Sequence, residues 1–212
     1  MQTVERVEPG WDLVKLMYAP SVRAEEIMLV AVDAAGRGGG GLRDALAALQ
    51  APIYVTDPDG VITYFNAACI GFAGRTPTVG KDRWCVTWKL YTDTGEFLPH
   101  DQCPMAVAIC EQSAVRGVTA IAERPDGARV AFLPLPTPVF ADDGRFLGAV
   151  NMLIDVTEVR QRADLRFQAE RCQRLARAIG DRRTSDTLTQ MANEFETKAA
   201  ELEQSPLLAR AA

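Results

Sequence analysis

The sequence predicts an α+β domain with a five-stranded antiparallel sheet and helices on one face, followed by a C-terminal α-helical extension. Hydrophobic runs are joined by hairpin turns, and short helical stretches separate the first two runs from the last three. The final run, 148–158, has no internal breaker and ends in Asp155 and Thr157, where a helix can begin. This arrangement would couple the sheet directly to a long helix.

Composition limits the classes of protein that need to be considered. The chain has 212 residues and 48% hydrophobic content, which suffices for one packed domain with extensions or for two small domains. A net charge of −5 argues against a broad nucleic-acid-binding face, because phosphate binding needs clustered Lys and Arg. The longest apolar run, 27–32, is too short to span a bilayer, and no secretory leader is apparent. We therefore expect a cytoplasmic protein with no nucleic-acid or membrane partner.

Residues 1–41 are predicted to form an N-terminal extension that ends in a glycine-rich linker. A short helix can begin at Ser21 and run to Val32. The run 36–41 contains five glycines but lacks the Lys-Ser/Thr pair of a phosphate-binding loop. A flexible linker is the better interpretation.

The predicted domain, 42–155, begins with a helix over 42–49 and a hairpin. Strands are expected at 53–56 and 61–65, because the intervening Asp-Pro-Asp-Gly sequence is typical of a tight turn. Asn66 is expected to cap a short helix that follows the second strand.

The middle of the domain is predicted to contain one clear helix. Residues 75–97 are expected to be irregular. A helix over 101–112 follows, in which Asp101 serves as the N-cap and Met105 and Ile109 lie on one side.

Three further strands complete the predicted sheet. Their turns, at 125–127 and 142–144, have hairpin chemistry. The strands are expected at 115–123, 129–140 and 145–154. The middle strand carries three alternate prolines, Pro134, Pro136 and Pro138, which remove backbone donors from one side. That part of the strand should be a free edge, a bulge, or a wall that faces something other than another strand.

The C-terminal region, 156–212, is predicted to be a helical signalling and dimerisation region. In 156–179 the apolar residues recur at spacings of four and three, which is typical of a seam for another helix. Thr184 or Ser185 can cap a second amphipathic helix that extends to Leu202. These helices can cover their own domain, each other or a second chain; we favour a homodimer that also presents them to a signalling partner.

Several segments of 42–158 resemble the PAS family in their amino-acid sequence and in their order along the chain. They are Ile53-Tyr-Val-Thr-Asp57, Gly60-Val-Ile-Thr-Tyr-Phe-Asn66, the turn before Arg129, and Gly144 through Asp155-Val-Thr-Glu158. The resemblance implies a five-stranded antiparallel sheet whose cleft senses small ligands, cofactors or partners, with transmission through flanking helices and common dimerisation. It suggests a free-standing bacterial sensory protein without enzymatic activity.

The predicted ligand site lies on the inner face of the last strand. Side chains alternate along a strand, so Ala149, Asn151 and Leu153 share one face, and the resemblance places that face toward the cleft. The candidate ligand-binding residues are these three together with Trp88, Met105 and Ile109. Asn151 would supply the polar group of an apolar pocket. Alternatively, Asn151 satisfies a neighbouring backbone group and the cleft is filled core.

Asp155 and Thr157 are the candidate residues for signal transmission. They stand between the last strand and the first long helix, where a cap or a carboxylate pair could respond to movement of the sheet.

Cofactor chemistry receives limited support from the sequence. His100, the chain's one histidine, precedes the predicted helix and could ligate haem, as a histidine on that helix does in haem-binding PAS sensors. A flavin photoadduct is rejected, because neither Cys69 nor Cys85 lies in the Asn-Cys-Arg-Phe-Leu-Gln type of helix that the light-sensing subclass uses. Cys103 and Cys110 cannot complete a zinc site, so no metal is expected.

An enzyme remains the alternative of a different class. A small α+β cone of the ketosteroid-isomerase type would also combine a curved sheet with helices, but its helices would precede the sheet. Here a long helical tail follows it.

Overall fold

A computed structural model describes residues 46–47 and 49–203, and they divide into two compact units. One unit is a domain that ends at Val156, and the other contains the helices that begin at Thr157. The helix expected over 21–32 and the glycine-rich linker lie outside the described residues.

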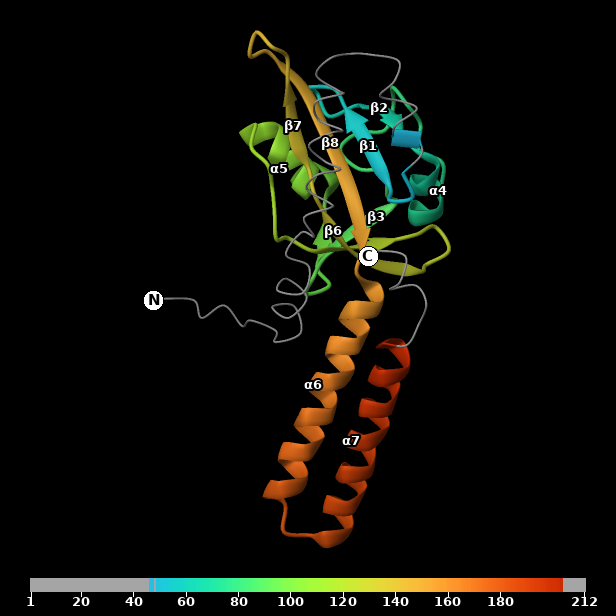
Figure 1. Ribbon diagram of the computed structural model, residues 1–212, viewed down its shortest axis with the longest axis vertical. Coiled ribbons are helices and arrows are strands. Elements are labelled where there is room, and N and C mark those ends of the chain that lie inside the picture. Colours follow the sequence, from blue (N-terminus) through green and yellow to red (C-terminus); the bar gives the residue numbers. More distant parts are fainter. Residues whose placement is uncertain (1–45, 48, 204–212) are drawn as a thin grey trace, which may run out of the picture. The chain divides into compact units, whose positions relative to one another are not determined.

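The domain is built on one antiparallel sheet with the strand order β2-β1-β8-β6-β5-β3-β4 (Figure 1). The strands are β1 Ile53–Thr56, β2 Ile62–Phe65, β3 Lys89–Thr92, β4 Phe97–Leu98, β5 Ala120–Glu123, β6 Arg129–Pro134, β7 Thr137–Phe140 and β8 Phe146–Asp155. The strand β8 lies between β1 and β6 and also pairs with β7. The predicted α+β class and antiparallel sheet are confirmed, with β8 as the central strand.

The prediction of five strands was too low. The strands β3 and β4 form a hairpin within the segment 75–97 that was expected to be irregular. The Thr92 N–H donates to the Glu96 carbonyl oxygen at 2.8 Å, and Gly95 supplies a φ of +88° in the turn. Strands of four and two residues are too short for an alternating pattern to stand out in the sequence.

The proline-containing strand is split into β6 and β7, as its missing donors require. Pairing between β5 and β6 ends at Phe132, so Pro134 and the later prolines lie beyond the part of the strand that β5 reaches. On that side of β7, Arg116 donates through Nη1 to the Pro136 carbonyl oxygen at 2.9 Å and through Nη2 to the Thr137 hydroxyl at 2.8 Å. The side of this segment turned away from β8 therefore faces a loop rather than a strand, as predicted.

The helices of the domain are shorter than expected. They are the 3-10 turn η1 His100–Gln102 and the α-helices α4 Ala67–Ala73 and α5 Pro104–Glu111. The prediction that Asp101 caps α5 was wrong, because Cys103 occupies the N-cap position in an extended conformation. A residue before proline is held out of the helical region, and Pro104 therefore fixes where α5 begins.

Asn66 stands at the N-cap of α4, but its side chain does not cap the helix as predicted. Its Oδ1 accepts from Ile53 N at 3.1 Å, and its Nδ2 donates to the carbonyl oxygens of Leu46, Leu49 and Ala51 at 3.2, 3.1 and 2.9 Å. This carboxamide fastens the segment before the sheet to β1.

The core of the domain lies between one face of the sheet and the helices α4 and α5. We call this face the inner face, and the side chains packed against it the inner cluster. The cluster joins Ala149 and Leu153 of β8 to Phe72 of α4 and to Met105 and Ile109 of α5. Phe72 meets Phe132 of β6 edge to face at 5.3 Å between ring centroids, a favoured aromatic geometry.

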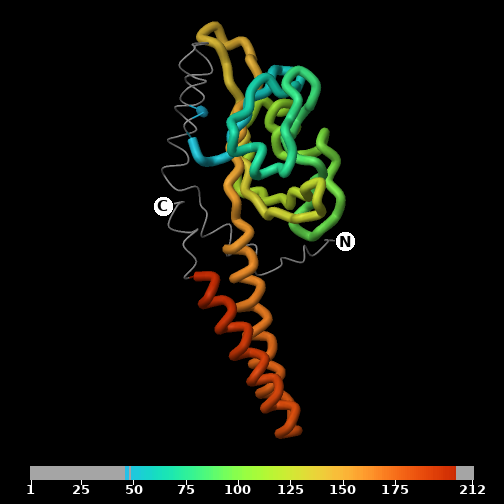
Figure 2. The backbone as a smooth tube through the Cα atoms, turned by 90° about the vertical axis from the view of Figure 1, so that its right-hand side faces the viewer, coloured from blue at the N-terminus to red at the C-terminus, as the bar shows by residue number. Residues whose placement is uncertain are grey.

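The second unit is an antiparallel hairpin of α6 Thr157–Ala178 and α7 Arg182–Glu203 (Figures 1 and 2). Ser185 Oγ donates to the Ala176 carbonyl oxygen at 3.0 Å near the turn, and Arg166 pairs with Glu203 at 3.0 Å near the open end. The two predicted helices are thus present, and they pack against each other within one chain.

The turn of the hairpin differs from the prediction. Asp181 precedes α7 and accepts from Thr184 N at 2.8 Å, so Asp181 provides the cap that was assigned to Thr184 or Ser185. Hydrogen bonds from Thr184 lower the pKa of Asp181. Ile179, expected within the seam, follows the end of α6 and is 42% exposed.

Candidate functional site

Asn151 lies at the centre of β8 and is fully committed to hydrogen bonds. Its side chain is 1% exposed. Oδ1 accepts from Leu135 N at 3.0 Å, and Nδ2 donates to the Tyr54 hydroxyl at 3.0 Å. Leu135 lies at the break between β6 and β7, and its N–H also donates to the Met152 carbonyl oxygen at 2.9 Å, so the carboxamide shares this donor with the backbone.

Tyr54 extends this contact across the inner face. It is paired with Asn151 in the register of β1 and β8, and residues directly opposite each other share one face of a sheet. Its hydroxyl donates to the Trp84 carbonyl oxygen at 2.9 Å. Burial raises the pKa of Tyr54 well above its ordinary value of 10.0, so the phenol remains neutral and can act as a donor.

Trp84 holds its carbonyl in place through an unusual backbone conformation. Its φ is +67°, in the left-handed region that a tryptophan seldom adopts. The indole packs so closely on Gly60 that a Cβ at that glycine would overlap the ring. The Trp84 amide also donates to the Gly60 carbonyl oxygen at 2.8 Å. These contacts fix the acceptor that Tyr54 uses.

Three buried cysteines, Cys69, Cys85 and Cys103, belong to the same inner cluster. Burial raises the pKa of Cys69 and of Cys103 to about 12, and it raises the pKa of Cys85 as well. Thiols with such pKa values carry little thiolate at neutral pH and are therefore poor nucleophiles. They act here as core side chains, whereas Cys110 is exposed.

Thr56 contributes a buried hydroxyl to the same face. It is opposite Ala149 in the register of β1 and β8 and is 1% exposed. Within the described part of the chain its Oγ1 has no hydrogen-bond partner. A buried hydroxyl without a partner is costly, so this atom is a position where a bound polar group could be stabilised.

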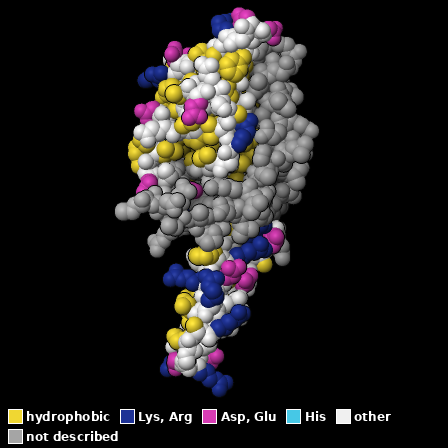
Figure 3. Space-filling view, turned by 90° about the vertical axis from the view of Figure 1, so that its left-hand side faces the viewer, with side chains coloured by type: hydrophobic (Ala, Val, Ile, Leu, Met, Phe, Trp, Pro, Cys, Tyr) yellow, Lys and Arg dark blue, Asp and Glu magenta, His cyan; other side chains and the backbone are white. Residues whose placement is uncertain are grey.

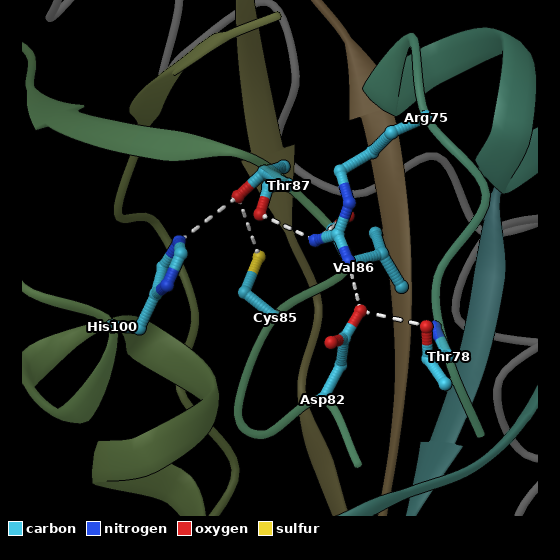
Figure 4. A network of polar contacts seen from close by, with 7 residues as sticks. All are labelled: Arg75, Thr78, Asp82, Cys85, Val86, Thr87 and His100. Carbon is cyan, nitrogen blue, oxygen red and sulfur yellow. Dashed lines mark hydrogen bonds and ion pairs between the residues drawn. The ribbon is translucent and has the colours of Figure 1, made fainter. Parts of the chain in front are cut away.

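A second polar network surrounds His100 (Figure 4). Arg75 forms an ion pair with Asp82 and donates to the Thr87 carbonyl oxygen at 3.2 Å. The Thr87 hydroxyl lies 3.4 Å from His100 Nε2 and 3.2 Å from Cys85 Sγ. Burial, and then the Arg75 charge, lower the pKa of His100. The network ties the loop before β3 to the turn before α5.

The contacts of His100 give no support to haem ligation. The histidine lies in η1, ahead of α5, and its Nε2 is directed at the Thr87 hydroxyl (Figure 4). A ligating imidazole would have to direct that nitrogen, or the other one, at iron. The inner cluster is composed of other side chains.

Four of the six predicted ligand-binding residues lie in the inner cluster: Ala149, Leu153, Met105 and Ile109. Asn151 is on the same face of β8. Trp88 is separate from them, because it precedes the edge hairpin and is 53% exposed. The structure therefore brings five of the six candidates together; whether they bind a ligand stays a prediction.

The two residues proposed for transmission flank a single residue. Asp155 ends β8, opposite Phe132 of β6, and Thr157 begins α6. Val156, between them, is fully buried and donates through its N–H to the Ala131 carbonyl oxygen at 2.9 Å. The junction between β8 and α6 is thus hydrogen-bonded to β6.

The sequence did not single out Tyr54, Thr56 or Arg75. Tyr54 and Thr56 could have been found, because they share one face of a strand that was predicted. Only the pairing of β1 with β8 was missing to place that face beside Asn151 and Ala149. Arg75 and its partner Asp82 lie in the segment that was expected to be irregular, where the sequence pattern gives no signal.

Comparison with known proteins identifies the fold family of residues 46–161, which match the family model described as "PAS fold". That match decides against the cone-shaped enzyme alternative. A search of curated proteins found no significant match.

Three solved structures are similar to this chain at low sequence identity. An RNA-binding light-oxygen-voltage receptor is 24% identical, with a TM-score of 0.46, over 62% of this chain and 37% of that chain. The PAS domain of Bordetella pertussis BvgS is 20% identical, with a TM-score of 0.39, over 55% and 84%. The PAS domain of the fruit-fly ELK potassium channel is 14% identical, with a TM-score of 0.40, over 59% and 95%.

Two properties of the described residues concern membranes and metal ions. No helix among them is long and apolar enough to cross a membrane. Across the same residues, His, Cys, Asp and Glu side chains form no group of three or more that could hold a metal ion.

Proposed function

Because the chain belongs to the PAS-fold family, we propose that it is a sensory signalling protein, not an enzyme, that binds a small ligand on the inner face of its sheet. In this proposal the state of the inner face reaches a protein partner through the C-terminal helices, and the protein acts as a homodimer. PAS domains are sensory and signalling modules, which supports the general role.

One observation carries the ligand proposal: a row of polar side chains on the inner face, one of which lacks a partner. Thr56 and Tyr54 of β1 and Asn151 of β8 lie together among apolar side chains. Tyr54 and Asn151 are satisfied by each other and by the backbone, but the Thr56 hydroxyl has no partner among the described residues. A few polar groups within an apolar lining are what a small-molecule site requires.

The connection between β8 and α6 supports the signalling part of the proposal. Asn151 belongs to the strand that continues, after Val156, into α6. A change in the hydrogen bonds of Asn151 would alter the position of β8 in the sheet. Because β8 continues along the chain into α6, the first turn of α6 would be displaced as well. Asp155 and Thr157 are the proposed transmitting residues.

The direct test is to identify what the purified protein binds. Native mass spectrometry and an absorption spectrum of the full chain would reveal a co-purifying ligand. Thermal-shift measurements with flavins, haem and a panel of small metabolites would reveal one that is lost during purification. The proposal expects one bound or stabilising compound, and no response in any of these assays would contradict it.

Two matched variants locate the site. Thr56→Val removes the unpartnered hydroxyl at little cost to shape, so it should weaken binding while leaving the free protein equally stable or more so. Thr119 is the matched control, because its buried hydroxyl also lacks a partner among the described residues. It directly precedes Ala120, whose side chain lies in the inner cluster, and neighbouring side chains along a strand point to opposite faces. If Thr119→Val weakens binding as much as Thr56→Val does, the site is not on the inner face.

A further inference from the structure

The hairpin of α6 and α7 carries more apolar surface than its own seam buries. Apart from Val159 and Arg162 in the first two turns of α6, the buried residues of the hairpin are small: Ala169, Cys172 and Ala176 on α6, and Ala192 and Ala199 on α7. Small side chains let two helices approach closely but contribute little apolar area. The larger apolar side chains therefore remain at the margin of the seam.

These larger side chains gather on one side of the hairpin. At about 100° per residue, Leu175 of α6 is displaced from Ala176 toward the same side of the hairpin as Met191 of α7 is from Ala192. Ile179, directly after α6, donates through its N–H to the Leu175 carbonyl oxygen at 3.1 Å and so lies one turn beyond Leu175. Leu175, Ile179 and Met191 are 48%, 42% and 41% exposed. Hydrophobic side chains are visible along one edge of the hairpin in Figure 3.

We call this surface the hairpin patch. It comprises Leu175, Ile179, Leu188, Met191 and Phe195, of which Leu188 and Phe195 are half-buried. The patch is continuous with the seam between α6 and α7, and it occupies the half of the hairpin that is nearer the turn.

The charges of the two helices differ in sign. The helix α6 contains six arginines and three acidic residues, whereas α7 contains three basic and five acidic residues. A basic helix beside an acidic helix is favourable within the hairpin. It would be favourable again between hairpins if α6 of one copy lay beside α7 of another.

We propose that the hairpin patch binds the same patch of a second copy of this chain, so that two hairpins form a four-helix bundle with two-fold symmetry. This inference rests on the proposed function and deepens it by assigning the dimer contact to a surface. A two-fold axis parallel to the helices brings both turns to the same end and places α6 of each copy beside α7 of the other.

The register of the hairpin predicts which charges would meet. Ser185 lies beside Ala176, and Glu203 lies beside Arg162 and Arg166, so residues at equal height can be assigned along both helices. By this register Arg171 is level with Glu194. Both residues lie on the outer margin of the patch. A rotation about an axis parallel to the helices leaves the position of each residue along that axis unchanged. Arg171 of each copy therefore meets Glu194 of the other.

The test is the mass of the full-length protein in solution, measured by sedimentation velocity over a dilution series. Wild type should sediment at twice the mass of the chain. Leu175→Glu and Met191→Glu should each raise the dimer dissociation constant by at least about 30-fold, because each places a charge in the centre of an apolar contact. Circular dichroism would show that each variant keeps its helices.

Phe167 provides the matched control. It is another partly exposed apolar residue of α6, at 36%, but it lies opposite the seam, about two turns from Leu175 and about 80° farther round the helix. Phe167→Glu should leave the dimer intact. A wild-type monomer at every concentration, or a dimer that survives both patch variants, would overturn the proposal.

Charge reversal tests the arrangement of the two hairpins. Arg171→Glu and Glu194→Arg should each weaken the dimer, and the double variant should recover the affinity. If the double variant is as weak as the sum of the two changes, the proposed register is wrong. These readouts need no small molecule, so they are separate from the failure of ligand binding.

Discussion

The Asn151 side chain donates to the Tyr54 hydroxyl at 3.0 Å, which joins the central strand β8 to β1 through the inner face of the sheet. The same hydroxyl donates to the Trp84 carbonyl oxygen, and the same carboxamide accepts from Leu135 N. One pair of side chains therefore connects two strands, a loop and the break between β6 and β7.

Replacing Tyr54 with phenylalanine should destabilise the domain. Tyr54→Phe leaves the Asn151 amide and the Trp84 carbonyl without this partner in a buried setting, which costs about 1–3 kcal/mol. Urea unfolding measures the change. Tyr91→Phe on β3, which lies next to the edge strand β4, is the control and should change stability by less than about 0.5 kcal/mol. Equal effects of the two changes would show that the buried pair has no special role.

Asn66 should matter more for stability than its position before a short helix suggests. Asn66→Ala removes four hydrogen bonds to the backbone from Leu46 to Ile53 and should cost at least about 2 kcal/mol. Asn193→Ala, on the exposed side of α7, should have little effect in the same unfolding experiment. A small loss at Asn66 would mean that water replaces these bonds without penalty.

Two glycines should respond to alanine in opposite ways. Gly148 has a φ of +124°, and a Cβ there would overlap the Thr56 carbonyl oxygen, so Gly148→Ala should destabilise β8 by more than about 1 kcal/mol. Gly71 lies inside α4 with open space around it, so Gly71→Ala should be neutral or stabilise by up to about 1 kcal/mol. Melting temperatures compare the two directly, and a tolerated Gly148→Ala would contradict the described approach of β8 to β1.

The one histidine should make stability depend on pH in a defined direction. The pKa of His100 is lowered from its ordinary value of 6.5 by burial and by Arg75, against the opposing influence of Asp82 and Asp101. The unfolded chain therefore binds the proton more readily. The stabilisation is present above pH 6.5 and is lost as the pH falls through the lowered pKa.

Urea midpoints measured over this range for wild type and His100→Gln would isolate the effect. The difference between the two proteins should change as the pH is lowered and should be constant above neutrality. A difference that is constant over the whole range would show that burial does not perturb this imidazole.

The strands that carry the site could be predicted because their signals are local. The Asp-Pro-Asp-Gly turn fixes the hairpin of β1 and β2, and the unbroken run through Asn151 identifies β8. Alternation then places Asn151 with Ala149 and Leu153. The three prolines correctly indicated that the side of β7 turned away from β8 would face something other than a strand.

The remaining parts depend on contacts between distant segments. Tyr54 becomes part of the site only because β1 pairs with β8. Its partner on β8, Asn151, is 97 residues farther along the chain. Asn66 looks like a helix cap in sequence, but burial gives its carboxamide other backbone partners. Trp88 was assigned to the site from its type and neighbourhood, and only the edge hairpin shows why it is exposed.

The central claim is that a change at the inner face reaches α6 through β8, and hydrogen–deuterium exchange measured by mass spectrometry tests it most directly. Comparison of wild type with Tyr54→Phe, and with Tyr91→Phe as control, requires no ligand. The account predicts faster exchange in β8 and in the first turns of α6 for Tyr54→Phe alone, with β3 and β4 unchanged. Faster exchange on the inner face with α6 unaltered would contradict it.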